Sequence, residues 1–375
     1  MLQIQLTTSG LLLWNHFSLT EECRTHVARA LDELEAAQLT GTAFEMQLKV
    51  WLGSTTMFTR GLLDETVEGL RQALEIAMKL DDVEYKLRCL RAIGLHELFT
   101  GHHVDGLASL QAFAAVAAAS DQSAIPESES HVAIAELFLG RLPSARRRLE
   151  QLRTDDVQHA QSAPRLRYQS NRSVDVACVL SQVQWLNGSP DTAREMAKDA
   201  IDRARATNHH LSLSTALSYA CPVFYWSGDY DACAIYLDML RQEALRHGFD
   251  VRRPVAMFYQ AALACTKDDA GTDVVDDLER AIDVFHATGH LARMPFYLAT
   301  QAEFLAKFGQ TRRAEGLLVT ALDCAETQRE MWCMPELLRI KALFRKDAGR
   351  ADEAEALLAR SIAIARETGA LSWQL

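Results

Sequence analysis

Residues 309–358 read GQTRRAEGLLVTALDCAETQREMWCMPELLRIKALFRKDAGRADEAEALL, and this stretch contains the same turn twice. Gly309 is followed five residues later by Ala314, and Gly349 is followed five residues later by Ala354. The two glycines lie 40 residues apart. A feature that returns with a period of about 20 to 50 residues is the sequence signature of a repeat protein.

The same turn recurs through the rest of the chain. Its glycines are Gly61, Gly101, Gly140, Gly188, Gly228, Gly309 and Gly349. They are separated by 40, 39, 48, 40, 81 and 40 residues, so the period is close to 40 and the gap of 81 holds two units. The fifth residue after each glycine is very small in six of the seven turns: Thr66, Gly106, Ala145, Ala193, Cys233, Ala314 and Ala354. Glycine accepts the backbone angles at the end of a first helix, and a small residue lets a second helix approach closely.

A second marker recurs between these turns. Its copies are ATNHH, RHGFD, ATGHL, ETQRE and ETGAL, which start at Ala206, Arg246, Ala287, Glu326 and Glu367, 40, 41, 39 and 41 residues apart. Two independent markers with one period predict an all-α solenoid of about nine helical hairpins. We expect a single domain over residues 1–375 in which each hairpin contacts only its neighbours. The longest unit contains a polar stretch, which we interpret as a long loop or hinge at residues 154–165.

Composition supports a helical protein and excludes several classes. The chain has only 18 glycines and 8 prolines in 375 residues, so helix breakers are few. The formal net charge of −11 argues against direct binding of nucleic acid. No apolar run is long enough to predict a membrane span. The eight cysteines form no CxxC pair, which predicts reduced thiols and a cytoplasmic location.

The turn pattern G-x-x-x-x-A followed by an apolar helix resembles the tetratricopeptide repeat, in a degenerate form near 40 residues. HEAT repeats share the period but lack this spacing between glycine and the small residue, and they rank second. Two segments, residues 11–34 and 288–344, together with the closing ETGALSWQL, look like parts of large bacterial signal-transduction ATPases. In that comparison Trp332 and Trp373 fill one equivalent position in successive repeats.

The resemblance implies a role but not the chemistry of the whole family. In these ATPases a winged-helix DNA-binding domain or a cyclase domain precedes a nucleotide switch, and the repeats form the sensor and protein-contact arm. This sequence contains no G-x-x-x-x-G-K-[ST] loop. We therefore expect the arm alone, either as a free-standing protein or as a fragment. The end of the sequence at Leu375, where a further helix would begin, favours a fragment.

No motif predicts catalysis or a metal site. The adjacent pairs His102–His103 and His209–His210 point about 100° apart on a helix, so they are poor chelators. Neither HExxH nor G-x-S-x-G occurs. We expect a protein without enzymatic activity, with no catalytic residues, no metal and no cofactor, and a helical-array hydrolase is remote.

Two sets of residues are candidates for binding a partner. A basic segment contains Arg146, Arg147 and Arg148, whose simplest interpretation is a solvated helix face. The second set lies at repeat-equivalent positions on the first helices of three hairpins, where we expect a concave groove: Arg252, Arg293, Tyr219, Tyr259 and Tyr297. Arginine and tyrosine are common anchors of interfaces, although the tyrosines are also suited to packing inside the repeats.

These observations favour a non-enzymatic module that binds a protein, a peptide or a small effector along its concave surface. We predict the sensor arm of a bacterial signalling ATPase that regulates transcription. The alternative is a free-standing tetratricopeptide adaptor that binds a peptide of a partner protein. No direct binding of nucleic acid or membrane is expected, and the sequence leaves the oligomeric state open.

Overall fold

A computed structural model of the chain describes residues 1–158, 167–267 and 270–374. Within these residues all regular structure is helical. The α-helices are α1 (Leu2–His16), α2 (Thr20–Ala36), α3 (Ala43–Thr59), α4 (Asp64–Lys79), α5 (Val83–Phe99), α6 (His103–Ser120), α7 (Ile125–Phe138), α8 (Leu142–Gln158), α9 (Arg172–Leu186), α10 (Pro190–Ala206), α11 (His210–Trp226), α12 (Tyr230–His247), α13 (Arg253–Thr266), α14 (Asp273–Ala287), α15 (Met294–Lys307), α16 (Thr311–Gln328), α17 (Met334–Asp347) and α18 (Ala351–Thr368). Three 3-10 helices follow α6, α12 and α18: η1 (Gln122–Ala124), η2 (Asp250–Arg252) and η3 (Leu371–Gln374).

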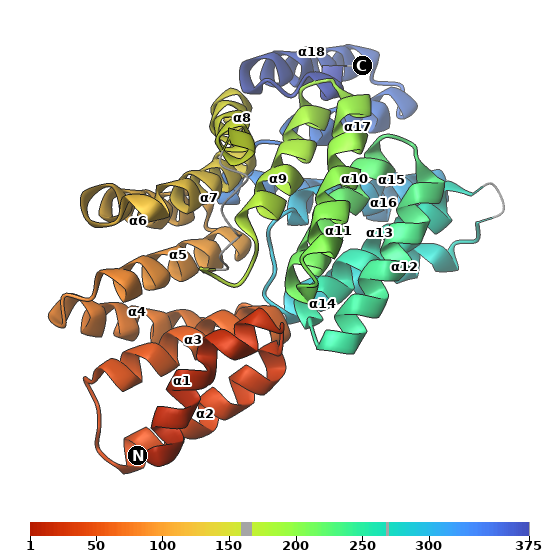
Figure 1. Cartoon of the computed structure of the whole chain (residues 1–375). Helices are drawn as coiled ribbons and strands as arrows, with labels where there is room; N and C mark the ends of the chain where they lie inside the picture. Colours follow the sequence, from red (N-terminus) through yellow and green to blue (C-terminus); the bar gives the residue numbers. More distant parts are fainter. Residues whose placement is uncertain (159–166, 268–269, 375) are drawn as a thin grey trace.

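Consecutive α-helices pair into hairpins, and each helix packs mainly against its neighbours in the chain. The described residues thus contain nine hairpins, from α1–α2 to α17–α18. The early hairpins stack along one side of the molecule, the later ones complete the superhelix, and the chain termini lie at opposite ends (Figure 1). The predicted all-α solenoid with about nine units is confirmed.

The turn glycines adopt the geometry that their positions require. All seven have a positive φ, between 72° at Gly140 and 132° at Gly61. The small residues five positions later are all buried, and Ala193 has no exposed surface. At Gly106 an added Cβ would lie 2.9 Å from the backbone nitrogen of Leu98 in the facing helix. The period of the sequence therefore reflects the close crossing of two helices in each hairpin.

The predicted long loop at residues 154–165 needs a correction. Helix α8 continues to Gln158, so the first part of this stretch is helical rather than loop. Three of the five residues from 154 to 158 are Asp or Gln, yet none of the five is a glycine or proline that would end a helix. Residues 159–166 lie outside the described part of the chain.

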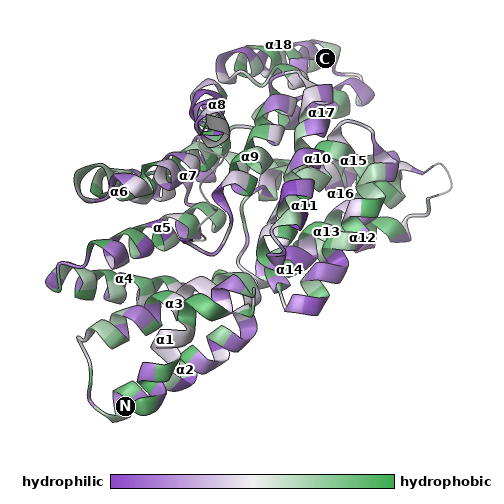
Figure 2. Cartoon of the chain, in the orientation of Figure 1, coloured by the Kyte–Doolittle hydropathy of each residue, from purple (hydrophilic) through white to green (hydrophobic). Residues whose placement is uncertain are grey.

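Apolar side chains form a nearly continuous interior. One cluster of buried residues runs from Leu87 to Ala370, and smaller clusters fill the first hairpins. Hydrophobic and hydrophilic stripes alternate around the helices (Figure 2). The eight cysteines are free thiols, of which Cys324 alone is partly exposed; the cytoplasmic location inferred from them remains a prediction. None of the described helices combines the length and apolar character that a membrane span requires.

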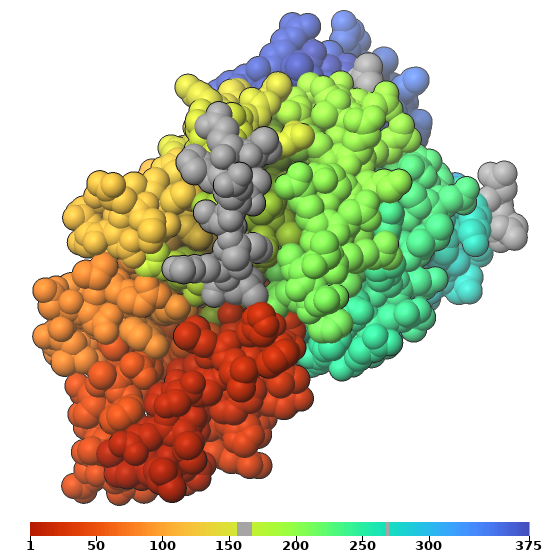
Figure 3. Space-filling view, in the orientation of Figure 1, coloured from red at the N-terminus to blue at the C-terminus, as the bar shows by residue number. Residues whose placement is uncertain are grey.

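The expectation that each hairpin contacts only its neighbours is wrong. The turn inside each of the first five hairpins contacts a segment that connects two hairpins, or follows the last one, much later in the chain. We call this line of contacts the superhelical seam. Its hydrogen bonds join His209 Nε2 to Asn15 O (2.9 Å), Leu62 N to Thr288 O (2.8 Å), Leu291 N to Phe99 O (2.8 Å), Met331 N to Phe138 O (2.9 Å) and Ser372 Oγ to Trp185 O (2.5 Å). Figure 3 shows the first hairpin packed directly against the middle of the chain. The superhelix is therefore closed on itself.

Two glycines permit the closest approach at the seam. A Cβ added to Gly61 would lie 2.5 Å from the carbonyl oxygen of Thr288. A Cβ added to Gly289 would lie 2.5 Å from the carbonyl oxygen of Leu62. Both residues have a positive φ, so a side chain at either position is opposed by backbone strain and by backbone overlap. The same glycines that shape the repeats also close the superhelix.

Ala193 tests the packing inside a hairpin. We expect Ala193→Leu to lower the free energy of unfolding by roughly 1–3 kcal/mol, because the buried crossing of α9 and α10 has no room for a larger side chain. Urea unfolding monitored by circular dichroism measures the change. Ala206→Leu, at the exposed end of the same helix, is the control and should change stability by less than about 0.5 kcal/mol. Equal stability of the two variants would contradict the assigned crossing.

Candidate functional site

The closed superhelix surrounds a hollow lined by residues of many hairpins. One cavity has an interior space of about 50 Å³, or about 450 Å³ with the part open to solvent. Its walls come from α3, α5, α7, α9, α11 and η2, and the segment before α9. The lining residues are Phe58, Arg91, Leu95, Phe99, His131, Ile134, Ser170, Asp175, Cys178, Val179, Thr215, Tyr219 and Arg252.

A second cavity adjoins the first. It has an interior space of about 30 Å³, or about 400 Å³ with the part open to solvent. It shares Phe99, Tyr219 and Arg252 with the first cavity. Its other lining residues are Phe138, Gln182, Ser218, Pro222, Val255, His290, Arg293 and Tyr297. We call the two cavities together the central hollow.

Arg91 enters the hollow from α5 and is 4% exposed. Its Nε donates to His131 Nε2 at 3.1 Å, and its Nη1 donates to Gln169 Oε1 at 3.0 Å. Its guanidinium also lies 4.7 Å from the centre of the Tyr168 ring. All of these direct partners are neutral groups, and the carboxylates of Asp175 and Glu127 act on the charge of Arg91 without forming an ion pair with it.

Arg252 and Arg293 are also buried, and each is 8% exposed. Arg252 donates to Thr215 Oγ1 at 3.1 Å, while its Nε is buried without a hydrogen-bond partner. Arg293 donates to Gln182 Oε1, and its guanidinium lies 5.0 Å from the centre of the Trp332 ring. Gln182 is held in place because its amide nitrogen donates to a backbone carbonyl of α11 at 2.9 Å.

None of the three arginines forms a side-chain ion pair with any residue that the structure describes. Burial lowers the pKa of Arg91 and Arg252, but a guanidinium stays protonated in proteins. Asp175 supplies the one carboxylate among the lining residues. Burial raises the pKa of Asp175 to about 6, and its Oδ1 is buried without a partner. The hollow is therefore positively charged overall at neutral pH.

The two histidines of the hollow do not add to this charge. Burial, reinforced by Arg91, lowers the pKa of His131 to about 3, and burial, reinforced by Arg252, lowers the pKa of His290 to about 3. His131 Nδ1 lies 2.5 Å from the carbonyl oxygen of Glu127. This contact assigns the proton to Nδ1 and leaves Nε2 to accept from Arg91.

Buried charges without counter-charges cost several kcal/mol each, so they are rarely retained for stability alone. Three guanidiniums around one hollow present donors in a geometry that suits a carboxylate or a phosphate. The aromatic walls (Phe58, Phe99 and Tyr219) exclude water and strengthen that attraction. The arrangement is thus suited to binding an anionic group rather than to acid–base catalysis.

The structure brings together four of the five residues that the sequence placed on a concave groove. Arg252, Arg293, Tyr219 and Tyr297 all line the central hollow. Tyr259 does not, because its fully buried ring packs against the rings of neighbouring aromatic residues.

The two arginines also reach the hollow from an unexpected place. Arg252 ends η2, and Arg293 precedes α15 with a φ of 69°. They therefore lie at the junctions between hairpins and not on the first helices as we expected. The reason is that the chain does not enter the next helix directly at these junctions. It forms the 3-10 turn η2 before α13, and it passes through the left-handed residue Arg293 before α15.

The sequence analysis missed Arg91, His131 and Asp175. They lie on α5, α7 and α9, and the junctions that precede these three helices lack the second marker. Arg91 and His131 lie 40 residues apart, at the repeat period. That spacing is the signal that identifies them as neighbours.

The basic segment lies away from the hollow, on α8. Arg146 pairs with Glu150 at 2.7 Å, and Arg148 pairs with Glu129 and Glu136. Arg147 is exposed. The charges of Arg146 and Arg148 are balanced within the chain, which fits the simpler interpretation of a solvated helix face.

Another cavity is a groove of about 300 Å³ on α16 and α17. Its cations are Arg312, Lys341 and Arg345, and Arg345 pairs with Glu315 and Glu353. Because part of this charge is balanced and the groove lies between two adjacent helices, we regard the central hollow as the stronger candidate site.

The neutral state of His131 predicts a pH dependence of stability. Its pKa is about 3 in the folded chain and about 6.5 when unfolded. The unfolded state therefore binds more protons between these values, and stability falls as the pH drops below 6.5. Between pH 7 and pH 5 this histidine should remove about 2 kcal/mol from the free energy of unfolding.

The variant His131→Gln measures that contribution. Glutamine offers both the acceptor for Arg91 and the donor for the Glu127 carbonyl, but it does not titrate. Urea unfolding at pH 7 and pH 5 should show a smaller loss in this variant than in the parent. His286→Gln, on the exposed face of α14, should leave the loss unchanged. An identical pH profile for parent and His131→Gln would contradict a buried neutral imidazole.

Comparison with known proteins establishes the fold. No family model matches the sequence, and no curated protein matches it. Among solved structures, a Rap protein complexed with competence and sporulation factor is similar over 98% of this chain and 99% of its own, with a TM-score of 0.68 and 12% sequence identity. NprR in complex with its cognate peptide NprX is similar over 96% of this chain and 97% of its own, with a TM-score of 0.58 and 14% identity.

A third similar structure is the Rap conjugation gene regulator of the plasmid pLS20 in complex with the Phr* peptide. It covers 97% of this chain and 95% of its own, with a TM-score of 0.59 and 10% identity. At such low identity these likenesses show the architecture alone. The chain has a tetratricopeptide-like helical-repeat fold.

Proposed function

We propose that this chain is a non-enzymatic regulator that binds a peptide or protein segment through an acidic group held in the central hollow. The observation that carries the proposal is the set of three buried arginines without carboxylate partners around one hollow. An anionic ligand supplies the missing counter-charge. Charge-assisted hydrogen bonds of this kind are about twice as strong as neutral ones.

The dimensions of the hollow define which part of a ligand enters it. The enclosed spaces of about 50 and 30 Å³ exceed the roughly 10–15 Å³ that one water molecule needs on this measure, so they admit a small polar group such as a carboxylate. The remainder of the ligand lies in the larger part that is open to solvent. Arg252 Nε and Asp175 Oδ1 are two of the buried polar atoms around the hollow that make no hydrogen bond. One is a donor and the other an acceptor, as the backbone of a peptide requires.

The similar structures support a peptide as the ligand class. The Rap protein was complexed with competence and sporulation factor, and NprR with its cognate peptide. In tetratricopeptide-like superhelices the interior surface is shared by several repeats. A ligand in that interior contacts distant hairpins at once, which suits a regulatory module.

For the more specific role, we propose the sensor arm of a bacterial signalling ATPase that regulates transcription, on the sequence resemblance described above. A free-standing adaptor is the alternative, since the described fold needs no nucleotide switch to form the hollow. Genomic context distinguishes them. A fused or adjacent reading frame with a phosphate-binding G-x-x-x-x-G-K-[ST] loop supports the sensor arm, and its consistent absence favours the adaptor.

Replacing Arg252 tests whether its buried charge lowers the stability of the folded chain. We expect Arg252→Met to raise the free energy of unfolding by about 1 kcal/mol or more, because an apolar side chain of similar length removes an unbalanced buried charge. Chemical unfolding measures the change. Arg253→Met is the matched control, because the charge of Arg253 is exposed and balanced: its Nη1 lies 3.4 Å from Asp250 Oδ1. Lower stability of Arg252→Met than of the parent would show that the charge is needed for folding.

The binding test uses fluorescent peptides that contain one Asp or Glu, paired with the same peptides that carry Asn or Gln instead. We expect the parent to prefer the acidic members in anisotropy titrations. Arg252→Gln and Arg293→Gln should each weaken binding at least tenfold, while helicity is retained. Arg253→Gln and the pair Arg147→Gln, Arg148→Gln should have smaller effects. Decisive loss on changing Arg147 and Arg148, or equal binding of acidic and neutral peptides, would refute the site.

A further inference from the structure

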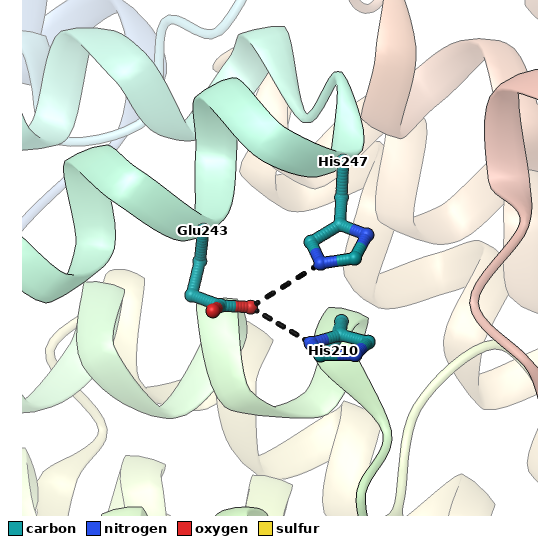
Figure 4. Close-up of side chains that lie close together, drawn as sticks. All are labelled: His210, Glu243 and His247. Carbon is teal, nitrogen blue, oxygen red and sulfur yellow. Dashed lines mark hydrogen bonds and ion pairs between the residues drawn. The ribbon is translucent and has the colours of Figure 1, made fainter.

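Three side chains with metal-binding atoms converge away from the central hollow, at the sixth hairpin. His210 is the first residue of α11, while Glu243 and His247 lie four residues apart near the end of α12. Residues four apart on a helix share one face, so both side chains of α12 project toward His210 (Figure 4). No two of these residues are adjacent in sequence.

The distances are close to those of a metal site. His210 Nδ1 lies 2.9 Å from Glu243 Oε2, and His247 Nε2 lies 3.7 Å from the same oxygen. All three atoms lie within 4.8 Å of one another. A tetrahedral Zn²⁺ with bonds of about 2.0–2.1 Å separates its ligand atoms by about 3.4 Å. The three atoms are thus close enough to share one ion, once one of the two stacked imidazole rings turns so that both nitrogen lone pairs point to it.

One ring nitrogen of the site has no hydrogen-bond partner in the protein. His247 Nε2 is buried and makes no hydrogen bond. The His247 ring is held between the rings of His210, at 3.9 Å, and Phe249, at 5.7 Å. Buried polar atoms are normally satisfied, so this nitrogen points to a missing ligand. Its ring is already oriented toward Glu243.

Charge supports the same conclusion. Glu243 is 8% exposed, and among the described residues its ion-pair contacts are with the two histidines only. The carboxylate of Glu243 therefore has no Lys or Arg partner among the described residues. A divalent cation balances it and uses the nitrogen lone pairs at the same time.

We propose that His210, Glu243 and His247 form a Zn²⁺ site with one coordination position open to a water molecule. Two imidazoles and one carboxylate suit a divalent ion of intermediate softness such as Zn²⁺. This inference is independent of the proposed peptide function, because it shares no residue with the central hollow.

The position of the site gives the ion a structural consequence. The ion joins the start of α11 to the end of α12, beside the apolar contact of Leu211, Phe249 and Phe58. The neighbouring His209 makes the seam contact to Asn15. Zinc therefore stabilises the junction at which the first two hairpins meet the sixth.

The test measures binding of Zn²⁺ alone to the full chain by calorimetry, and of Co²⁺ by its visible absorption. Cys324 is replaced by Ser throughout, because it is the partly exposed thiol. We expect one ion per chain and a melting temperature that rises when Zn²⁺ is added. His247→Ala should weaken binding at least tenfold and abolish the rise, and His286→Ala, on the exposed face of α14, should change neither.

His247→Ala is the decisive variant because it leaves the 2.9 Å contact between His210 and Glu243 intact. Its melting temperature without metal shows whether it folds. If it does not fold, His247→Gln and Glu243→Gln are measured in the same way. Absence of binding to the parent, or equal affinity of the parent and of a folded variant at these positions, would overturn the proposal.

Discussion

Glu330 holds the two halves of the superhelix together. This carboxylate has no exposed surface and accepts from three places: His103 Nε2 at 3.0 Å, the backbone nitrogen of Arg293 at 3.0 Å and Trp332 Nε1 at 2.6 Å. His103 begins the second helix of the third hairpin, whereas Arg293 lies between the seventh and eighth hairpins and Trp332 between the eighth and ninth. One buried carboxyl group thus links early and late hairpins and fixes the backbone from which Arg293 enters the hollow.

Closure explains why the interior differs from an open concave groove. The seam brings α5 and α7 against α11, η2 and α15, and their side chains share one enclosed space. Arginines that would face water in an open solenoid are 4–8% exposed in this one. Aromatic rings and neutral acceptors solvate the guanidiniums in part, and Asp175 is the one carboxylate among the residues that line the hollow. If the hollow binds an anionic group as proposed, these buried charges are an example of stability given up for function, as is common at functional sites.

The repeats were predictable because a hairpin is a local structure. The spacing from Gly188 to Ala193 reflects one turn and one helix crossing, both formed within a few residues. The seam could not be predicted from the sequence, because its position depends on small rotations between successive hairpins that accumulate over the array. Arg252 and Arg293 were identified through their repeat positions, yet the same reasoning included Tyr259, whose ring packs in the core. His210 and Glu243 lie 33 residues apart, so only the folded hairpin brings them together.

The hollow and the seam are mechanically linked through Arg293. Its guanidinium faces the hollow while its backbone nitrogen contacts Glu330, which contacts the third hairpin in turn. On the proposal that an anionic group binds in the hollow, the ligand contacts a side chain whose backbone is tied to the third hairpin through Glu330. Binding in the hollow would thereby act on the contact between early and late hairpins, to the extent that the ligand has different affinities for different arrangements of them.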